Sequence, residues 1–362
     1  MEDMVVPIRS GAPNVEFWRG KRVLVTGHTG FKGGWLVIWL YRMGAKVFGL
    51  SMTPVTTPNL FESASIDTIC DSHFCDIRNQ KEVGQLIRKI EPEIVLHLAA
   101  QPLVRESYQS PIETFATNVM GTGHILEGLR DVDSVRVAVM ITTDKVYKNN
   151  EWFWPYRETD ELGGHDPYSA SKAASEILIE SYRSAFLADK GKAISTARAG
   201  NVMGGGDWSA DRLIPDALRA WQEGRKIDIR RPDAVRPWQH VLEPLAGYLK
   251  LSEVTWNDSQ LAGAYNFGPE SGQAASVRTV IELAKSTYGS GRVMFGDGCD
   301  GPHEAGLLTL DVAKSKSLLN VQSRWSLDVS VRRTILWYMS QERGADARGL
   351  CELDIDSYEG LA

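Results

Sequence analysis

The chain has 362 residues, of which 43% are hydrophobic and 24% charged, and its formal net charge is −6 at pH 7. This length and composition predict one large globular unit with a smaller appendage. The mixed charge argues against a nucleic-acid-binding or membrane-surface protein, and no apolar run is long enough to span a bilayer, so we expect a cytoplasmic protein. No spacing of histidines and cysteines suggests a metal site.

Residues 1–16 are predicted to be a poorly ordered extension. After them, compact apolar runs alternate with longer helical stretches. Strands are predicted over residues 22–27, 46–50, 94–100, 135–142 and 193–199, and helices over residues 34–43 and 167–187. This alternation predicts an α/β fold, namely a Rossmann-type doubly wound parallel sheet with helices on both faces.

From about residue 201 the alternation weakens and Gly, Pro and Arg become more frequent. We expect residues 17–200 to form the dinucleotide-binding domain, with residues 238–272 returning to it. The remaining ranges, residues 201–237 and 273–362, are predicted to form a smaller C-terminal substrate-binding region.

A glycine-rich loop follows the first predicted strand, with the sequence Gly27-His28-Thr29-Gly30-Phe31-Lys32-Gly33. A strand that ends here and a helix that begins here aim free helix amides at a negative group, and small residues let the backbone approach a pyrophosphate. The loop therefore predicts a dinucleotide site, whereas the alternative is an ordinary strand-to-helix turn.

The second predicted strand ends at Ser51 and Met52, without the acidic residue that usually binds the adenosine ribose 2′-hydroxyl. No cluster of Arg or Lys lies nearby for a 2′-phosphate, so the sequence favours NAD over NADP. Asp76 and Ile77 follow a probable third strand, where they are placed to contact the adenine. The alternative for Asp76 is an ordinary solvated aspartate in a turn.

Tyr168 and Lys172 lie four residues apart on a predicted helix, so they share one face. A lysine beside a phenol stabilises the phenolate and lowers the pKa of the tyrosine, which can then accept a proton from a sugar hydroxyl. Thr143, at the end of a predicted strand, can hydrogen-bond the same hydroxyl. The alternative is that both are ordinary residues of the helix surface without a catalytic role.

Together, these residues resemble those of the extended short-chain dehydrogenase/reductase family, from about residue 17 to residue 337. The resemblance implies that Gly27, Gly30 and Gly33 form the dinucleotide loop and that Leu98, Ala99 and Ala100 lie beside the nicotinamide. It also implies a catalytic triad of Thr143, Tyr168 and Lys172, with Tyr168 and Lys172 contacting the cofactor as well. Members of this family commonly pair through the helices near residues 118–129 and 168–187, which implies a homodimer or a dimer of dimers.

Asp144 and Lys145 directly follow Thr143 and narrow the reaction. Simple dehydrogenases and 4-epimerases of this family need no extra acid and base there, whereas a sugar 4,6-dehydratase does. We expect Asp144 to protonate the departing C6 hydroxyl and Lys145 to move the C5 proton, provided that burial or a nearby cation keeps the lysine partly neutral. An Asp-Lys pair resembles the dehydratases that act on CDP-glucose, while those that act on dTDP-glucose carry Asp-Glu. A surface ion pair is the alternative.

Further segments are similar to the nucleotide-sugar dehydratase branch of the family. A nucleotide-diphosphate sugar brings two phosphates, which Arg212 and Arg236 can clamp with paired hydrogen bonds. Asn201 can donate to the diphosphate, and Trp208 or Trp238 can form a wall for the base. The other candidate substrate residues are Gln101, Arg105, Asp207 and His240. His97 and His124 are predicted to be core or helix histidines.

The sequence thus predicts an NAD-dependent lyase that converts CDP-D-glucose by oxidation at C4, elimination across C5 and C6, and hydride return to C6. Three alternatives stay open. A 4-epimerase needs only Thr143, Tyr168 and Lys172, a dehydratase can act on another nucleotide hexose, and an NAD-sensing binding protein can keep the fold without the activity.

Overall fold

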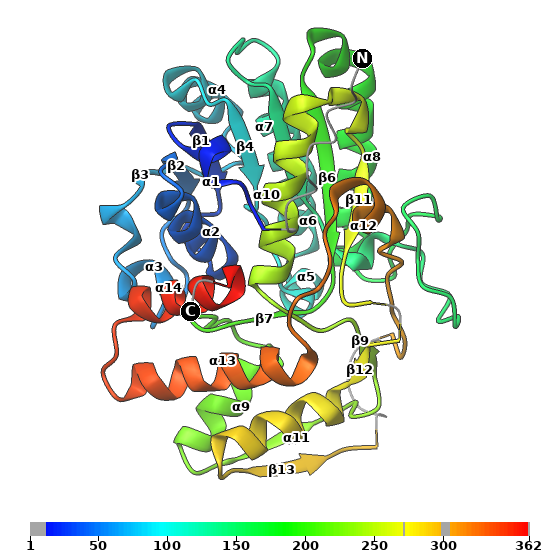
Figure 1. The fold of residues 1–362 in the computed structure, drawn as a ribbon. Coiled ribbons are helices and arrows are strands. Elements are labelled where there is room, and N and C mark those ends of the chain that lie inside the picture. Colours follow the sequence, from blue (N-terminus) through cyan, green and yellow to red (C-terminus); the bar gives the residue numbers. More distant parts are fainter. Residues whose placement is uncertain (1–11, 271, 298–304, 361–362) are drawn as a thin grey trace, which may run out of the picture.

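A seven-stranded parallel sheet forms the centre of the molecule in the computed structural model, which describes residues 12–270, 272–297 and 305–360 (Figure 1). Across the sheet the strands are β3 (Asp71–Phe74), β2 (Lys46–Ser51), β1 (Arg22–Thr26), β4 (Ile94–His97), β5 (Val137–Ile141), β6 (Ala193–Ala199) and β11 (Ala264–Phe267). The first six strands have the order of a doubly wound dinucleotide fold, so the predicted fold class is confirmed. The strand predicted over residues 94–100 ends earlier, at His97.

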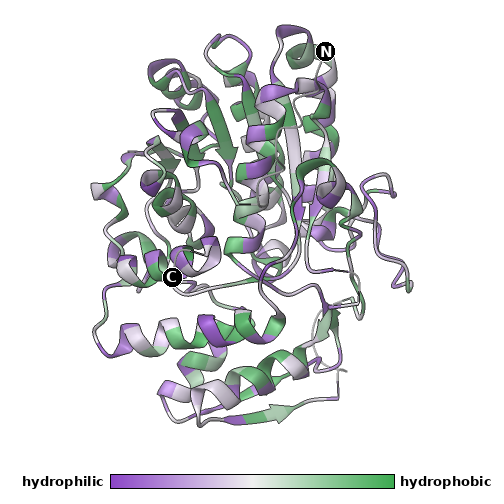
Figure 2. Cartoon of the chain, in the orientation of Figure 1, coloured by the Kyte–Doolittle hydropathy of each residue, from purple (hydrophilic) through white to green (hydrophobic). Residues whose placement is uncertain are grey.

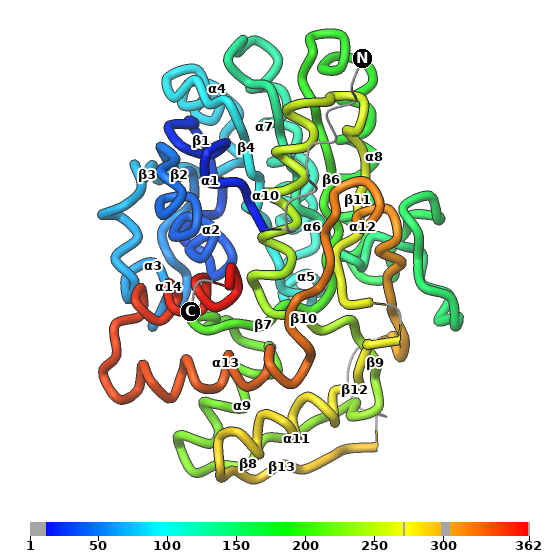
Figure 3. Tube along the Cα trace, in the orientation of Figure 1, coloured from blue at the N-terminus to red at the C-terminus, as the bar shows by residue number. Residues whose placement is uncertain are grey.

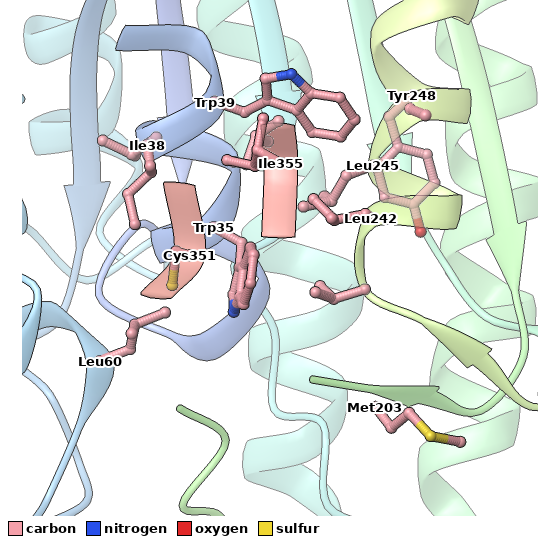
Figure 4. Close-up of a cluster of buried hydrophobic side chains, with 14 of the residues drawn as sticks. Trp35, Ile38, Trp39, Leu60, Met203, Leu242, Leu245, Tyr248, Cys351 and Ile355 are labelled. Carbon is pink, nitrogen blue, oxygen red and sulfur yellow. The ribbon is translucent and has the colours of Figure 1, made fainter. Parts of the chain in front are cut away.

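Helices cover both faces of this sheet. One face carries α2 (Phe31–Arg42) and α10 (Leu242–Asn257), and the other carries α4 (Gln80–Ile90), α7 (Thr122–Leu129) and α8 (Pro167–Tyr182). The strand β5, which is covered on both sides, is apolar throughout, and Figure 2 shows hydrophobic residues along the centre of the sheet. Figure 4 shows how Trp35 and Trp39 of α2 pack towards α10 and towards the last helix, α14 (Ala347–Glu359).

The smaller region lies beyond the carboxyl ends of the central strands. Three short strand pairs belong to it: β7 (Val202–Met203) with β10 (Gln239–His240), β9 (Val235–Arg236) with β12 (Ala275–Ser276), and β8 (Lys226–Ile229) with β13 (Arg292–Phe295). Its main helices are α9 (Leu213–Gln222), α11 (Val277–Tyr288) and α13 (Leu327–Glu342).

Short helices complete the chain. They are α1 (Val15–Trp18), α3 (Leu60–Ser63), α5 (Val104–Gln109), α6 (Pro111–Phe115), α12 (Ala313–Leu319), the 3-10 turns η1 (Ile66–Thr68), η3 (Asp144–Val146), η5 (Ala188–Lys190) and η6 (Ser259–Leu261), and the π-helical turns η2 (Ala116–Gly121) and η4 (Arg183–Leu187). The helix predicted over residues 167–187 is therefore α8 followed by the looser turn η4. Among the described residues, no helix is long and apolar enough to cross a membrane.

The two ends of the chain differ from the expected domain division. A poorly ordered extension is predicted for residues 1–16. Residues 1–11 lie outside the described residues, and for residues 12–16 the prediction is wrong. Asn14 caps α1, and its backbone amide donates to Glu253 Oε1 at 2.6 Å. At the other end, α14 packs on α2 and α3 of the sheet unit as well as on α13 of the smaller region, as Figure 3 shows. Residues 238–272 contribute α10 and β11 to the sheet unit.

Candidate active site

A cavity of about 860 Å³ lies where the carboxyl ends of β5 and β6 face the smaller region. Ligands of doubly wound folds bind in this position, outside the carboxyl ends of the strands. Thr143, which follows β5, and Gly200, which follows β6, both line it. The opposite wall comes from the segment before α9, from β8 and from β9.

The turn η3 places Asp144 and Lys145 on the cavity wall. Thr143 caps this turn, because its Oγ1 accepts a hydrogen bond from the Lys145 amide at 3.4 Å and donates one to Asp144 Oδ1 at 2.9 Å. Tyr168 lines the same cavity from the first turn of α8, and Lys172 is buried one turn further along that helix. The structure therefore brings all five predicted catalytic residues together.

Asp144 is a buried carboxyl group, and burial raises its pKa. The charge of Lys145 and the hydrogen bond from Thr143 only partly offset this effect. Asp144 Oδ2 has no hydrogen-bond partner in the part of the chain that the structure describes. A Cβ added at Gly200 would lie 3.2 Å from this oxygen and 2.4 Å from Pro237 Cγ, so the glycine leaves the room that the carboxyl occupies. A carboxyl whose pKa is raised and that has one unpaired oxygen suits a general acid.

Burial also lowers the pKa of Lys145. Asp144 opposes this shift, while the positive charges of Arg236 and Arg212 add to it. The ammonium nitrogen lies 5.9 Å from the centre of the Tyr168 ring. Both conditions that we set for a lysine base, burial and a neighbouring cation, are met at this residue.

The predicted low pKa of Tyr168 is wrong for the protein's own side chains. Burial raises the pKa of Tyr168 to about 12, and Arg212 and a hydrogen bond with Thr143 offset it only in part. Lys172 is itself affected, because burial lowers its pKa to about 8 against the opposing charge of Glu176. Its Nζ donates to the Ile141 carbonyl at 3.4 Å. The four-residue spacing of Tyr168 and Lys172 carries no information about this cost of burial.

The glycine loop fits a dinucleotide. Gly30 caps α2 without any side-chain hydrogen bond, so the first amides of this helix stay available for a phosphate. Gly27 has a φ of +75°, and a Cβ there would lie 2.8 Å from the Ala99 nitrogen. At Gly33 a Cβ would lie 2.1 Å from the Gly27 oxygen. Any larger residue at these two positions would disrupt the loop against the helix and the end of β4.

The other side chains of the loop have separate partners. Thr29 Oγ1 lies 2.8 Å from Ser51 Oγ, which occupies the place where an acidic ribose ligand is usually found. His28 is buried, which lowers its pKa to about 4, and its Nε2 lies 3.1 Å from Ser72 Oγ. Lys32 is partly buried, and burial lowers its pKa to about 8. Phe31 packs on Gly204, where a Cβ would lie 3.0 Å from the ring.

Two further segments are predicted to contact the cofactor. The carboxylate of Asp76 accepts hydrogen bonds from Arg78, which lower its pKa, so contact with an adenine stays a prediction. Ile77 is buried, and its side chain packs on Gly121. The amides of Leu98 and Ala99, which lead to Ala100, both donate to Thr26 Oγ1 at 3.1 Å and so bring the end of β4 against the glycine loop.

The predicted substrate residues divide into two groups. Six of them line the cavity: Arg105, Asn201, Asp207, Arg212, Arg236 and Trp238. Arg105 forms an ion pair with Asp211 at 2.7 Å, and Asp211 lines the cavity as well. Trp238 donates from its indole nitrogen to the Ala275 carbonyl at 3.0 Å.

Three predicted substrate residues lie away from the cavity. Gln101 makes all its side-chain hydrogen bonds within its own region, to Leu103 and Thr114. The Trp208 ring packs edge to face on Tyr338, with centres 5.0 Å apart. His240 is fully buried between tryptophan rings, and burial lowers its pKa to about 3. We therefore withdraw a direct substrate contact for these three residues.

Other lining residues escaped the sequence analysis. Arg230 and Arg231 follow β8 and line the cavity, as do Lys148 and Asn149 after the catalytic turn. Two consecutive arginines directly before Pro232, in a region rich in Arg, were the signal that could have found Arg230 and Arg231. His97 is confirmed as a core histidine, since its Nδ1 lies 2.7 Å from Thr26 Oγ1 and burial lowers its pKa to about 3.

Comparison with known proteins identifies the family. The model of the family described as GDP-mannose 4,6 dehydratase matches residues 24–334. The chain belongs to this family. Among its relatives, the CDP-glucose 4,6-dehydratase of Salmonella typhimurium is 43% identical over 348 residues, which cover 94% of this chain and 97% of that protein. The dTDP-glucose 4,6-dehydratase of Xanthomonas campestris is 26% identical over 342 residues, or 88% of this chain and 93% of that one.

Solved structures share the fold of this dehydratase family member. A UDP-glucose-4-epimerase from Stenotrophomonas maltophila, with bound NAD and formylated UDP-arabinopyranose, superposes with a TM-score of 0.76 at 22% identity, over 89% of this chain and 99% of that one. The dTDP-glucose 4,6-dehydratase from Bacillus anthracis, in complex with NAD, has a TM-score of 0.74 at 20% identity, over 89% and 97% of the two chains.

Proposed function

We propose that the chain is an NAD-dependent lyase that removes water from CDP-D-glucose and gives CDP-4-keto-6-deoxy-D-glucose. One observation carries the proposal: Asp144 and Lys145 lie in a single turn beside Thr143 and Tyr168, on the wall of one cavity. The relative with 43% identity, named CDP-glucose 4,6-dehydratase, supports the same substrate. Epimerisation, or NAD binding without turnover, would leave the acid and the base without a role.

NAD is the proposed cofactor, and two of the solved structures that share this fold are described with NAD bound. The amides at the start of α2 would face its pyrophosphate, while Ala99 and Lys172 would lie towards its nicotinamide end. When bound, NAD supplies an acceptor for the hydride of the sugar C4 and returns that hydride to C6.

In the oxidation step, Tyr168 takes the proton of the C4 hydroxyl while Thr143 hydrogen-bonds the same oxygen. The phenolate form is required, and the positive charge of Arg212 favours it against burial, which raises the pKa of Tyr168. The low exposure of Tyr168 and Lys172 keeps bulk water away from the reacting atoms.

The elimination step uses the acid and the base of the turn η3. A ketone at C4 acidifies the C5 proton, which the neutral amine of Lys145 removes. Asp144 gives its proton to the C6 hydroxyl, which leaves as water, and a double bond forms between C5 and C6. Lys145 afterwards returns a proton to C5 as the hydride arrives at C6. The raised pKa of Asp144 and the lowered pKa of Lys145 favour these starting protonation states.

The rest of the cavity is proposed to hold the nucleotide. Arg212 and Arg236 face the same space as the catalytic turn, and a planar guanidinium binds phosphate oxygens in pairs. Asn201 would donate to the diphosphate, Asp207 would accept from a sugar hydroxyl, and Trp238 would form part of the wall.

A homodimer is part of the proposal. Apolar side chains lie exposed on α6, η2 and α8, with 77% of Ile112, 56% of Met120 and 62% of Ile177 accessible. Such a patch on a folded protein commonly marks a contact with another chain. A cytoplasmic location also remains part of the proposal.

A substrate panel tests the proposed function. Purified protein with NAD is given CDP-, dTDP-, UDP- or GDP-glucose, and loss of water is followed by mass spectrometry. We expect the highest kcat/KM with CDP-glucose. Water loss from another nucleotide sugar instead would overturn the choice of base, and an isomeric hexose without water loss would identify an epimerase.

A further inference from the structure

A buried ion pair lies beneath the catalytic residues and has no role in the mechanism above. Glu176 of α8 and Arg198 of β6 expose only 3% and 4% of their side chains. Two hydrogen bonds join them, from Arg198 Nε to Glu176 Oε1 at 2.9 Å and from Nη2 to Oε2 at 2.8 Å. Neither residue lines the cavity. Burying two charges is costly, so a pair kept in this place calls for a purpose beyond stability.

The pair holds both ends of the segment that carries the acid and the base. At one end, Thr142 Oγ1 donates to Glu176 Oε1 at 2.5 Å. At the other end, the Tyr147 hydroxyl accepts from Arg198 Nη1 at 2.9 Å and donates to an amide oxygen of β11 at 2.7 Å. The four residues between these anchors, 143–146, include Asp144 and Lys145.

The same carboxylate acts on Lys172, which precedes it by one helical turn on α8. The charge of Glu176 opposes the effect of burial on the pKa of Lys172. In the described part of the chain, two other titratable groups near this lysine give no such support. Lys32 of α2 repels it, and His97 of β4 has a pKa of about 3 and is therefore neutral.

We propose that the Glu176–Arg198 ion pair is a positioning unit. It fixes the turn that carries the acid and the base in its place relative to Tyr168 and Lys172. The inference rests on the proposed function, in which the first pair acts at C4 and the second at the adjacent C5 and C6 of one sugar. A misplacement of about 1 Å between such groups can cost about 10²-fold in rate. The unit acts through other residues and does not touch the substrate itself.

The first test is the variant Glu176→Gln, which keeps the size of the side chain and removes its charge. Lysine labelled with ¹³C at Cε reports the titration of Lys172 by NMR, with no substrate present. We expect its midpoint to move from about 8 in the parent protein to a value lower by about one pH unit or more. A folded variant with an unchanged midpoint would overturn the electrostatic part of the inference.

Steady-state kinetics on the NAD-loaded enzyme test the geometric part. Glu176→Gln should lower kcat for dehydration by about 10²-fold with KM little changed. Tyr147→Phe removes one anchor but keeps the carboxylate, so it should lower kcat and leave the Lys172 midpoint in place. If Glu176→Gln does not fold, Tyr147→Phe decides the question, and an unchanged kcat there would refute the inference.

A matched control is Glu243→Gln. This buried glutamate of α10 accepts hydrogen bonds from the Trp325 amide at 2.7 Å and the Tyr358 hydroxyl at 2.9 Å, away from the catalytic residues. It should lose stability but keep the parent kcat, which separates positioning from a general loss of folding. If the parent protein does not dehydrate CDP-glucose, the proposed function fails, whereas the titration of Lys172 still tests this inference.

Discussion

Replacing Asp144 by asparagine tests the proposed general acid at the level of one atom. Thr143 Oγ1 donates to Asp144 Oδ1 at 2.9 Å, and an asparagine can keep this bond and the packing over Gly200. The variant loses only the proton that the carboxyl holds. General acid catalysis contributes about 10²- to 10⁴-fold in rate, so we expect kcat to fall by that factor, equivalent to about 2.7–5.4 kcal/mol of activation free energy.

The assay is kcat for water loss from CDP-glucose across a range of pH, together with thermal melting of both proteins. In the parent, activity should fall as pH rises through the raised pKa of Asp144, because the acid must be protonated. Ionising this buried group also costs the folded state, so the free energy of unfolding falls with rising pH, and Asp144→Asn should be at least as stable as the parent at alkaline pH. A variant with kcat within about threefold of the parent, less than any general acid contributes, would refute the assignment.

Three further predictions concern the base, the cofactor and the assembly. Lys145→Met should abolish exchange of the C5 proton with D₂O, followed by NMR of the sugar, and retained exchange would assign the base elsewhere. Gly27→Ala places a Cβ 2.8 Å from a backbone nitrogen, so the Kd for NAD in calorimetry should rise by about tenfold or more. The matched control Gly191→Ala, where nothing lies within 4 Å, should leave that Kd unchanged. Ile177→Glu should convert a dimer to monomers in light scattering, whereas an unchanged mass would exclude α8 from the interface.

Periodicity and motif spacing predicted the parts of the molecule that depend on local sequence. The apolar runs before Gly27 and Thr143 are buried on both faces, and this apolar pattern is typical of parallel strands. Each motif lies at the end of such a strand, where doubly wound folds bind their ligands. The four-residue spacing of Tyr168 and Lys172 put both on one face of α8. These features need no knowledge of distant contacts.

The errors arose where a side chain's surroundings come from distant parts of the chain. His240 lies in a motif of candidate substrate residues, but rings from Trp35 and Trp325 enclose it. The pKa of Tyr168 depends on how deeply the smaller region buries it, which spacing cannot reveal. The prediction of poor order is also wrong at residues 12–16, because the Asn14 amide donates to Glu253, far along the sequence.

Transfer of deuterium from C4 to C6 within CDP-glucose tests the central claim most directly. The protein is incubated with NAD and C4-deuterated CDP-glucose, and the product is analysed by mass spectrometry and NMR. Our account predicts a keto-deoxy sugar that has lost one water and carries the label at C6. Label that returns to C4 without loss of water, or a substrate that stays unchanged, would contradict it.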